Sequence, residues 1–354
     1  MLLGETQIKE KQRLDYIDTI RGIGILFVVI GHHLLGADGL VVWIYSFHMP
    51  LFFIITGYLY AYKKDKCKDI KALIINKAKS LMYPYINFSL INIIWYFIFY
   101  IVTPIGGQPE ESFTVVLLKS VTTLGYHAMW FLPALFISTV LFSIINRNKA
   151  SRFIHIVVML FGWVVCILLR QNGMEHGVVW YIFNYISRLA VATSFIYIGY
   201  LIGKFLTKLN NLTEWIWIGV CAVVAGITLI INLSNMNQYN IALSNIGNPV
   251  LFYISGISNS MLLLLIFKKI NFKKGLLNFY GKNSLLIMAL HMGFPVEIAW
   301  LIVGVIGSSF SAIIASLAVI IIELIIMTIC ILLINKYFKF IIRIPDKRNR
   351  SIEK

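Results

Sequence analysis

The sequence has few charged residues for its length. Only 13% of its 354 residues are Asp, Glu, Lys or Arg, whereas 59% are hydrophobic, and the mean hydropathy is +0.82. Soluble globular domains carry about 25% charged residues, so the composition excludes an ordinary soluble protein. The long apolar runs differ from the short alternating segments of an outer-membrane barrel. We therefore predict an all-α integral membrane protein, a bundle of about ten transmembrane helices.

Cysteine is also scarce. The chain has four cysteines, Cys67, Cys166, Cys221 and Cys330, and their positions do not match the spacing of metal ligands. We predict free thiols and no metal site.

Apolar segments of roughly 20 residues, the length that crosses a bilayer, recur along the whole chain. We predict ten spans, at 17–36, 42–62, 83–103, 128–146, 153–170, 180–203, 214–233, 247–267, 278–300 and 310–334. The shorter amphipathic segment 112–126 is expected on the outer surface or as a re-entrant piece. The loops are too short to fold alone. We thus predict one domain over residues 1–354, with a cytoplasmic segment 1–16 and a cytoplasmic tail 335–354.

Acidic residues are the rarer charge, and the formal net charge is +16. Of the 31 Lys and Arg residues, 26 fall in alternate loops and the two terminal segments. The positive-inside rule then places both termini in the cytoplasm. We interpret the charge as a signature of topology and lipid contact, not of nucleic-acid binding. A multi-pass protein of the cell (inner or plasma) membrane is expected.

The first predicted span contains a cation and an imidazole on one helical face. Arg21 and His32 are eleven residues apart. On an α-helix, this spacing brings the two side chains to within ~20° of the same direction around the axis and separates them by ~16 Å along it. Arg21 alone can be a snorkelling interfacial residue, and His32 alone can be a buried residue bonded to a neighbouring helix. Polar residues inside a membrane are costly and mark functional sites, so together they predict one.

Further candidates lie at the ends of later spans. His48 opens the second span, where Thr56 adjoins Gly57, and Trp130 opens the fourth. Thr56 and Gly57 also suit simple helix packing. Trp130 and His48 also suit the membrane interface.

The ninth predicted span places Ser284 and His291 seven residues apart, again on one face. His291 can be a site residue or a structural histidine. Arg188 and Glu323 are lone charges inside predicted spans, and the sequence leaves open whether they pair with each other or with histidines. Lys77 and Lys79 precede the third span, where lysines meet lipid phosphates or a phosphorylated cofactor.

Several of these segments resemble the acyltransferase-3 family of ten-helix membrane acyltransferases. Arg21 and His32 resemble its basic residue, ten-residue gap and histidine, and FFIITGYLY resembles its FFxxSG element, with Thr56 in place of serine. WFLPALF and GKNSLLIMALH are similar to later blocks of the family. Lys77 and Lys79 stand where the family often has arginines, and lysine cannot make the bidentate phosphate contact of arginine. The chain most resembles the stand-alone, polysaccharide-modifying branch.

The resemblance implies transfer of an acyl group, usually acetyl from acetyl-CoA, to a hydroxyl of an extracytoplasmic glycan or its lipid-linked precursor. We expect Arg21, Lys77 and Lys79 to bind the cytosolic acyl-CoA. His48, Trp130 and Thr56 are expected to bind the acceptor.

Two chemical roles are open for His32, a general base towards the acceptor hydroxyl or a transiently acylated nucleophile. His291, Ser284 or Arg21 can stabilise the oxyanion. A transporter or flippase for a glycolipid or small metabolite is the alternative function, because intramembrane charges suit it too.

Overall fold

The computed structural model describes residues 14–62, 69–102, 111–171, 177–237, 239–270, 275–306 and 310–343. Apart from an isolated bridge between Asn240 and Asn245, these residues form helices and their connections. The prediction of an all-α protein is therefore confirmed. Most of the predicted cytoplasmic segment 1–16, the end of the tail 335–354 and Cys67 lie outside the described residues.

In chain order, the helices are α1 (Asp15–His33), α2 (Asp38–Tyr45), α3 (His48–Tyr62), α4 (Ile70–Lys77), the π-helical turn η1 (Ala78–Met82), α5 (Tyr83–Tyr96), the π-helical η2 (Phe97–Val102), α6 (Phe113–Val121), the 3₁₀ turn η3 (His127–Trp130), α7 (Phe131–Ile145), α8 (Ser151–Gln171), α9 (Val178–Leu206), α10 (Asn211–Ser234), the 3₁₀ turn η4 (Ile241–Leu243), α11 (Pro249–Ile270), α12 (Leu276–Lys282), α13 (Ser284–Leu290), α14 (Phe294–Ile306), α15 (Ala312–Tyr337) and the 3₁₀ turn η5 (Lys339–Ile341).

Within the described residues, eight helices are long and apolar enough to span a membrane, or nine if the bent pair α13 and α14 is one span. The first of our ten predicted spans is not among the eight. Its counterpart α1 carries Asp15, Asp18, Arg21 and two histidines, but most of its residues are buried inside the bundle. A helix surrounded by protein does not need the apolar surface of one that faces lipid.

The ninth predicted span is not one continuous helix, although α13 and α14 together are apolar enough to form one broken span. Residues 276–306 form α12, α13 and α14, and α13 and α14 meet at 60°. The second break precedes Pro295, which has no backbone N–H and fits only the first turn of a helix, here α14. The break leaves His291 at the end of α13 instead of inside a straight span.

The third span begins earlier than predicted. Residues 70–102 form one helical run, and residues 70–82, which we predicted as part of a loop, belong to α4 and η1. The π-helical turn lies directly before Pro84 at the start of α5. A wider turn accommodates the missing donor and the ring of proline.

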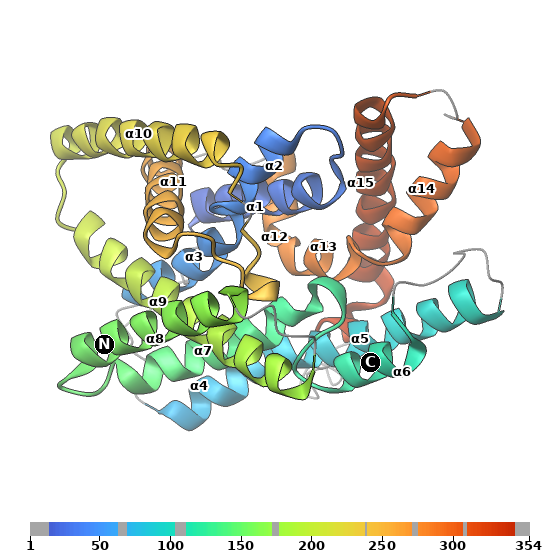
Figure 1. Cartoon of the computed structure of the whole chain (residues 1–354), viewed down its shortest axis with the longest axis horizontal. Coiled ribbons are helices and arrows are strands. Elements are labelled where there is room, and N and C mark those ends of the chain that lie inside the picture. The colour runs from blue at the N-terminus through green and yellow to red at the C-terminus, as the bar shows by residue number, and fades with distance from the viewer. Residues whose placement is uncertain are drawn as a thin grey trace, which may run out of the picture.

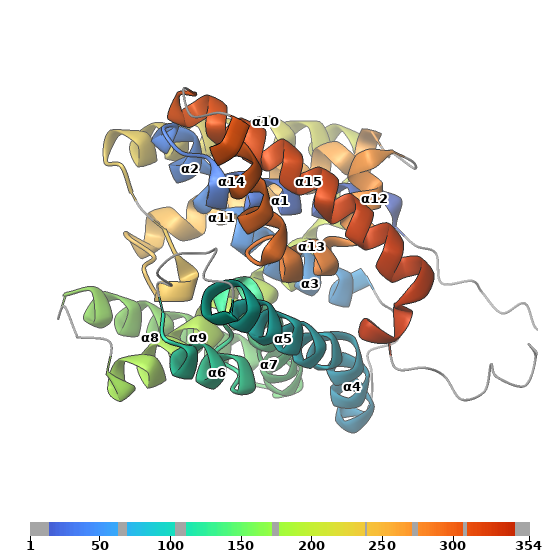
Figure 2. The same ribbon diagram turned by 90° about the vertical axis from the view of Figure 1, so that its right-hand side faces the viewer.

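Figures 1 and 2 show the helices in two groups. In both views α4 to α9 lie together, and α1 to α3 lie with α10 to α15. α3 and α9 pack against each other at the junction. A Cβ atom on Gly57 would overlap the Ile196 carbonyl, and one on Gly199 would overlap that of Ile54. Gly57 therefore serves close packing of two backbones.

α1 packs in the same way against α12. A Cβ atom on Gly22 would overlap the carbonyl of Leu277, and one on Gly281 would overlap the carbonyl of Asp18. This reciprocal contact fixes the position of α1 near the end that carries Arg21.

Helix ends that we predicted on the same side of the membrane contact each other. Lys268 at the end of α11 pairs with Glu214 at the start of α10. At the opposite side, the amide of Leu35 donates to Ser316 Oγ on α15 (3.0 Å). These contacts agree with helices that alternate in direction. Which side faces the cytoplasm stays a prediction.

Candidate active site

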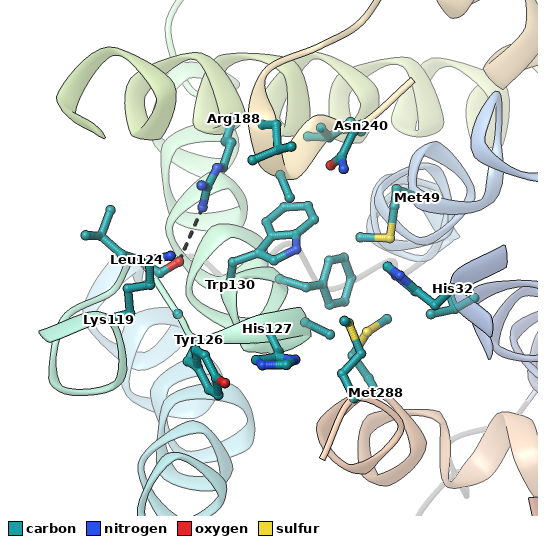
Figure 3. Close-up of a pocket in the computed structure, with 18 of the residues that line it drawn as sticks. His32, Met49, Lys119, Leu124, Tyr126, His127, Trp130, Arg188, Asn240 and Met288 are labelled. Carbon is teal, nitrogen blue, oxygen red and sulfur yellow. Dashed lines mark hydrogen bonds between the residues drawn. The ribbon is translucent and has the colours of Figure 1, made fainter. Parts of the chain in front are cut away.

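A cavity of about 570 Å³ lies where the two groups of helices meet (Figure 3). Its lining includes His32 of α1, Tyr45 of α2, His48 of α3, Trp130 of η3 and Arg188 of α9. The rest of the lining comes from parts of segments 111–131, 180–181 and 239–243, and from Val28, Met49, Met288 and Met292. Most of these segments lie at helix ends that we predicted to be extracytoplasmic. The lining contains no residue of the predicted cytoplasmic loops that the structure describes.

His32 presents one ring nitrogen to this cavity. Its Nδ1 lies 3.1 Å from the hydroxyl of Tyr45. Its Nε2 has no hydrogen-bond partner among the described residues, and the side chain is only partly buried. Met49 and Met288 flank the ring in Figure 3, so its surroundings are apolar. The ring is held on one side and open to the cavity on the other.

His48 has a defined tautomer. Its Nδ1 lies 2.8 Å from the carbonyl oxygen of Ile44, and a carbonyl only accepts hydrogen bonds. Nδ1 therefore carries the proton, and Nε2 of the neutral ring is an acceptor. The Tyr45 and His48 ring centroids are 4.8 Å apart, so Tyr45 lies between two imidazoles.

His291 lies behind His32, with ring centroids 5.3 Å apart. It is fully buried, and its Nδ1 lies 3.1 Å from each of the Ile287 and Met288 carbonyl oxygens. Nδ1 is again the protonated atom, so Nε2 of the neutral ring carries a lone pair. A neutral His291 in this geometry cannot donate a hydrogen bond to an oxyanion.

Glu323 pairs with a histidine and not with Arg188, which answers the question that the sequence left open. Its carboxylate, fully buried on α15, lies 3.5 Å from Nε2 of His33. The same Nε2 lies 3.2 Å from the backbone oxygen of His291. Nε2 of His33 thus contacts both the Glu323 carboxylate and the His291 carbonyl oxygen, so α1, α13 and α15 meet at this point.

Arg188 is buried in the wall of the cavity, with 8% of its surface exposed. Its Nε donates to Asn184 Oδ1 (3.0 Å) and its Nη1 to the Leu124 carbonyl (3.3 Å). Its guanidinium carbon lies 5.5 Å from the centroid of the Trp130 ring. Lys119 also lines the cavity, where it forms an ion pair with Glu111.

Comparison with known families decides what kind of protein carries this cavity. The family model of an acyltransferase domain matches residues 14–336. The chain belongs to the acyltransferase-3 family. The resemblance drawn from its motifs is therefore confirmed, and a membrane acyltransferase is supported. No curated protein and no solved structure matches the chain.

The residues of the acyltransferase that we predicted to bind acyl-CoA lie outside the cavity that contains His32. Arg21, 33% exposed, lies 3.7 Å from Asp18. Lys77 ends α4, and Lys79 is exposed in η1. None of the three lines the cavity.

Thr56 and Ser284 do not line the cavity of the acyltransferase either. The hydroxyl of Thr56 donates to the Phe52 carbonyl of its own helix (2.9 Å). Ser284 begins α13, the short helix at whose other end His291 lies. The structure thus brings together His32, His48 and Trp130, with His291 in contact behind them.

Several lining residues of the acyltransferase were not predicted, among them Tyr45, Tyr126, Lys119 and Asn240. Burial raises the pKa of Tyr126, so its phenol is a neutral donor at physiological pH. These residues lie mainly in loops or short helices, where no periodic pattern marks a buried face. For Lys119 and Tyr126, the one local signal was proximity to HAMW (127–130), the segment that opens the fourth predicted span.

The described residues contain no group of three His, Cys, Asp or Glu side chains that could hold a metal ion. Cys166, Cys221 and Cys330 are free thiols, as predicted.

Proposed function

We propose that this acyltransferase moves an acetyl group from cytosolic acetyl-CoA to a hydroxyl of a cell-surface glycan or its lipid-linked precursor. The observation that carries the proposal is the position of His32. An imidazole with one nitrogen held by Tyr45 and the other open to the cavity is suited to activating a hydroxyl. The family supports acyl transfer in general, and the donor and acceptor are part of the proposal.

His32 acts as the general base. This role requires the tautomer in which Nδ1–H donates to the Tyr45 oxygen, because the lone pair of Nε2 then faces the cavity. Nε2 removes the proton of the acceptor hydroxyl while the hydroxyl oxygen attacks the thioester carbonyl. The tetrahedral intermediate then breaks its C–S bond, the new ester C–O bond remains, and the proton passes from His32 to the CoA thiolate. In the covalent variant Nε2 itself attacks the thioester carbonyl, and the C–S bond breaks to release the CoA thiolate. The acceptor hydroxyl then attacks the acyl-imidazole, the C–N bond breaks, and the hydroxyl proton passes to the thiolate.

The donor approaches from the side that carries Arg21. Arg21 lies ~16 Å along α1 from His32 and remains partly exposed. Its guanidinium suits a phosphate or the polar pantetheine arm of CoA. Lys77 and Lys79 add positive charge near the same side of the membrane, where a polyanionic donor is attracted.

The acceptor occupies the cavity. Trp130 and the neighbouring aromatic residues offer flat apolar surfaces, and His48 and Asn240 offer polar contacts. A volume of about 570 Å³ lies within the range of small-ligand sites. Thr56, expected to bind the acceptor, and Ser284, expected to aid catalysis, take no part in this proposal, because neither lines the cavity.

The proposal is tested by comparing surface glycans of cells with and without the protein by mass spectrometry. Acetylation adds ~42 Da per site, and the signal should be lost in the His32→Gln variant, since removal of a general base costs about 10²- to 10⁴-fold. His155→Gln is the control, because His155 is a histidine inside another helix that stacks on Tyr197 and does not line the cavity. An unchanged glycan in cells with a normally expressed His32→Gln protein would refute the site.

The two variants of the mechanism differ in one measurement. Acetyl-CoA labelled in its acetyl group, given to the purified protein without acceptor, leaves a protein-bound label only in the covalent variant. Absence of label after rapid acid quenching favours the general base.

A further inference from the structure

Arg188 is a buried cation without a carboxylate partner among the described residues. Removing a charge from water is costly unless it is paired, and buried arginines in proteins are usually matched by an anion. Among the described residues, Arg188 contacts only the neutral oxygens of Asn184 and Leu124 and the face of Trp130. Glu323, buried elsewhere in the bundle, is paired with His33 instead.

The free hydrogen-bonding capacity of Arg188 faces the cavity. A guanidinium has five N–H donors, and two of them are used by Asn184 Oδ1 and the Leu124 carbonyl. Nη2 has no partner among the described residues, although the side chain lines the cavity. The remaining donors match the fork that binds a carboxylate or phosphate through two parallel hydrogen bonds.

The charge of the cavity is not balanced by the protein. Lys119 and Glu111, which also line it, neutralise each other as an ion pair. Arg188 therefore remains as one uncompensated positive charge among the lining residues. In Figure 3 the Trp130 ring lies between Arg188 and His32, so a ligand that spans the cavity reaches from the guanidinium across the indole to the imidazole.

We propose that Arg188 and Trp130 form a subsite for an anionic sugar unit, so that the acceptor carries a carboxylate or phosphate beside the hydroxyl that His32 activates. This inference rests on the proposed function, because it assumes that the acceptor enters this cavity. The anion binds the guanidinium, and a sugar ring lies against the indole. The hydroxyl to be acylated then points towards Nε2 of His32.

A phosphate of the acyl donor is a less suitable occupant. CoA carries several phosphates, whereas the cavity has a single uncompensated cation. The lysines near the membrane surface lie instead around α4 and η1. No residue of the described part of those elements lines the cavity.

Equilibrium binding to the purified full-length protein tests the subsite without any need for turnover. The probes are methyl glucuronide, glucose 6-phosphate, neutral methyl glucoside and, for the nucleotide end of CoA, adenosine 3′,5′-bisphosphate. We expect at least one anionic sugar to bind about 10- to 100-fold more tightly than methyl glucoside, the effect of hydrogen bonds to a charged group. The carboxylate and phosphate arms show which anion is preferred.

In Arg188→Gln the preference of the anionic sugar over methyl glucoside should fall to near one, and Arg188→Lys should restore part of it. Arg170→Gln is the matched control, since Arg170 is exposed at the end of α8 and does not line the cavity. It should keep the full preference. Equal binding of neutral and anionic sugars to the native protein, or a preference that survives Arg188→Gln, would overturn the inference. So would Arg188-dependent binding of adenosine 3′,5′-bisphosphate alone.

The two proposals fail separately. If glycan acetylation depends on His32 but the probes show no anionic preference, the subsite is wrong and the function stands. If the probes show the Arg188-dependent preference but no glycan changes in mass, the subsite stands and the acyl acceptor is not a glycan.

Discussion

Tyr45 offers the sharpest test of how His32 works. Its hydroxyl lies 3.1 Å from Nδ1 of His32, and it is the hydrogen-bond partner of that ring among the described residues. Tyr45→Phe removes one oxygen atom and keeps the ring that packs against His48. The substitution therefore changes the orientation and proton affinity of His32 without opening a large space.

The size of the effect follows from the energy of one hydrogen bond. A neutral hydrogen bond contributes about 0.5–1.5 kcal/mol. If that contribution is lost in the transition state, the rate falls roughly 2- to 13-fold, since about 1.4 kcal/mol is a factor of ten. This loss is far smaller than the ~10²- to 10⁴-fold expected when the base itself is removed. Tyr45→Phe should therefore be a weakened enzyme and not an inactive one.

The assay is acetyl transfer by the purified protein, measured for the single variants and for the double variant. In a His32→Gln background Tyr45→Phe should add almost nothing, because the hydroxyl acts through His32. Tyr62→Phe is the control, since Tyr62 is exposed at the end of α3 and lies outside the cavity. A further severalfold loss in the double variant would refute the reasoning, as would full activity of Tyr45→Phe.

Three further predictions concern the donor, the packing and the topology. Arg21→Gln should raise KM for acetyl-CoA several-fold and leave acceptor binding unchanged. The measurement is steady-state kinetics with each substrate varied in turn, and a change in the acceptor KM alone would contradict the prediction. Gly199→Ala should destabilise the fold by about 1–3 kcal/mol, because the added methyl group meets the Ile54 carbonyl. Gly219→Ala is the control, since Gly219 has open space around it. Unfolding curves in detergent with equal midpoints for the two variants would disprove the contact. In a cysteine-free background, Ser112→Cys should react with a membrane-impermeant thiol reagent added to intact cells, whereas Asp69→Cys should react only after lysis. The reverse pattern would show that the predicted orientation is inverted.

Much of the helical pattern could be predicted because hydropathy is a local property. Each of the ten predicted spans has helical counterparts in the structure. The breaks around α13 were missed because the apolar run continues through them, although Gly293 and Pro295 were a local warning. The helical start of the third span was missed because its lysines resemble those of a cytoplasmic loop.

The candidate site was predictable only in part. His32, His48 and Trp130 were found because polar or aromatic residues stand out inside apolar segments. The pairing of Glu323 with His33 could not be found, because the two residues are 290 positions apart and nothing in either segment specifies the other. Tyr45 was overlooked because a tyrosine at a membrane interface is common and its hydrogen bond to His32 depends on the angle between α1 and α2.

The polar, buried character of α1 bears on how the protein is made. α1 precedes every other described helix in the chain, and its charged and histidine side chains make it poorly suited to lie in lipid alone, since polar and ionisable residues inside a membrane are expensive. α12 packs against α1 at Gly22, and Glu323 of α15 lies beside His33. Both partners come much later in the sequence than α1. During synthesis, α1 must therefore remain without these partners until α12 and α15 have been made. A nascent chain that stops before α15 has all the residues that line the cavity but lacks Glu323, which lies beside His33.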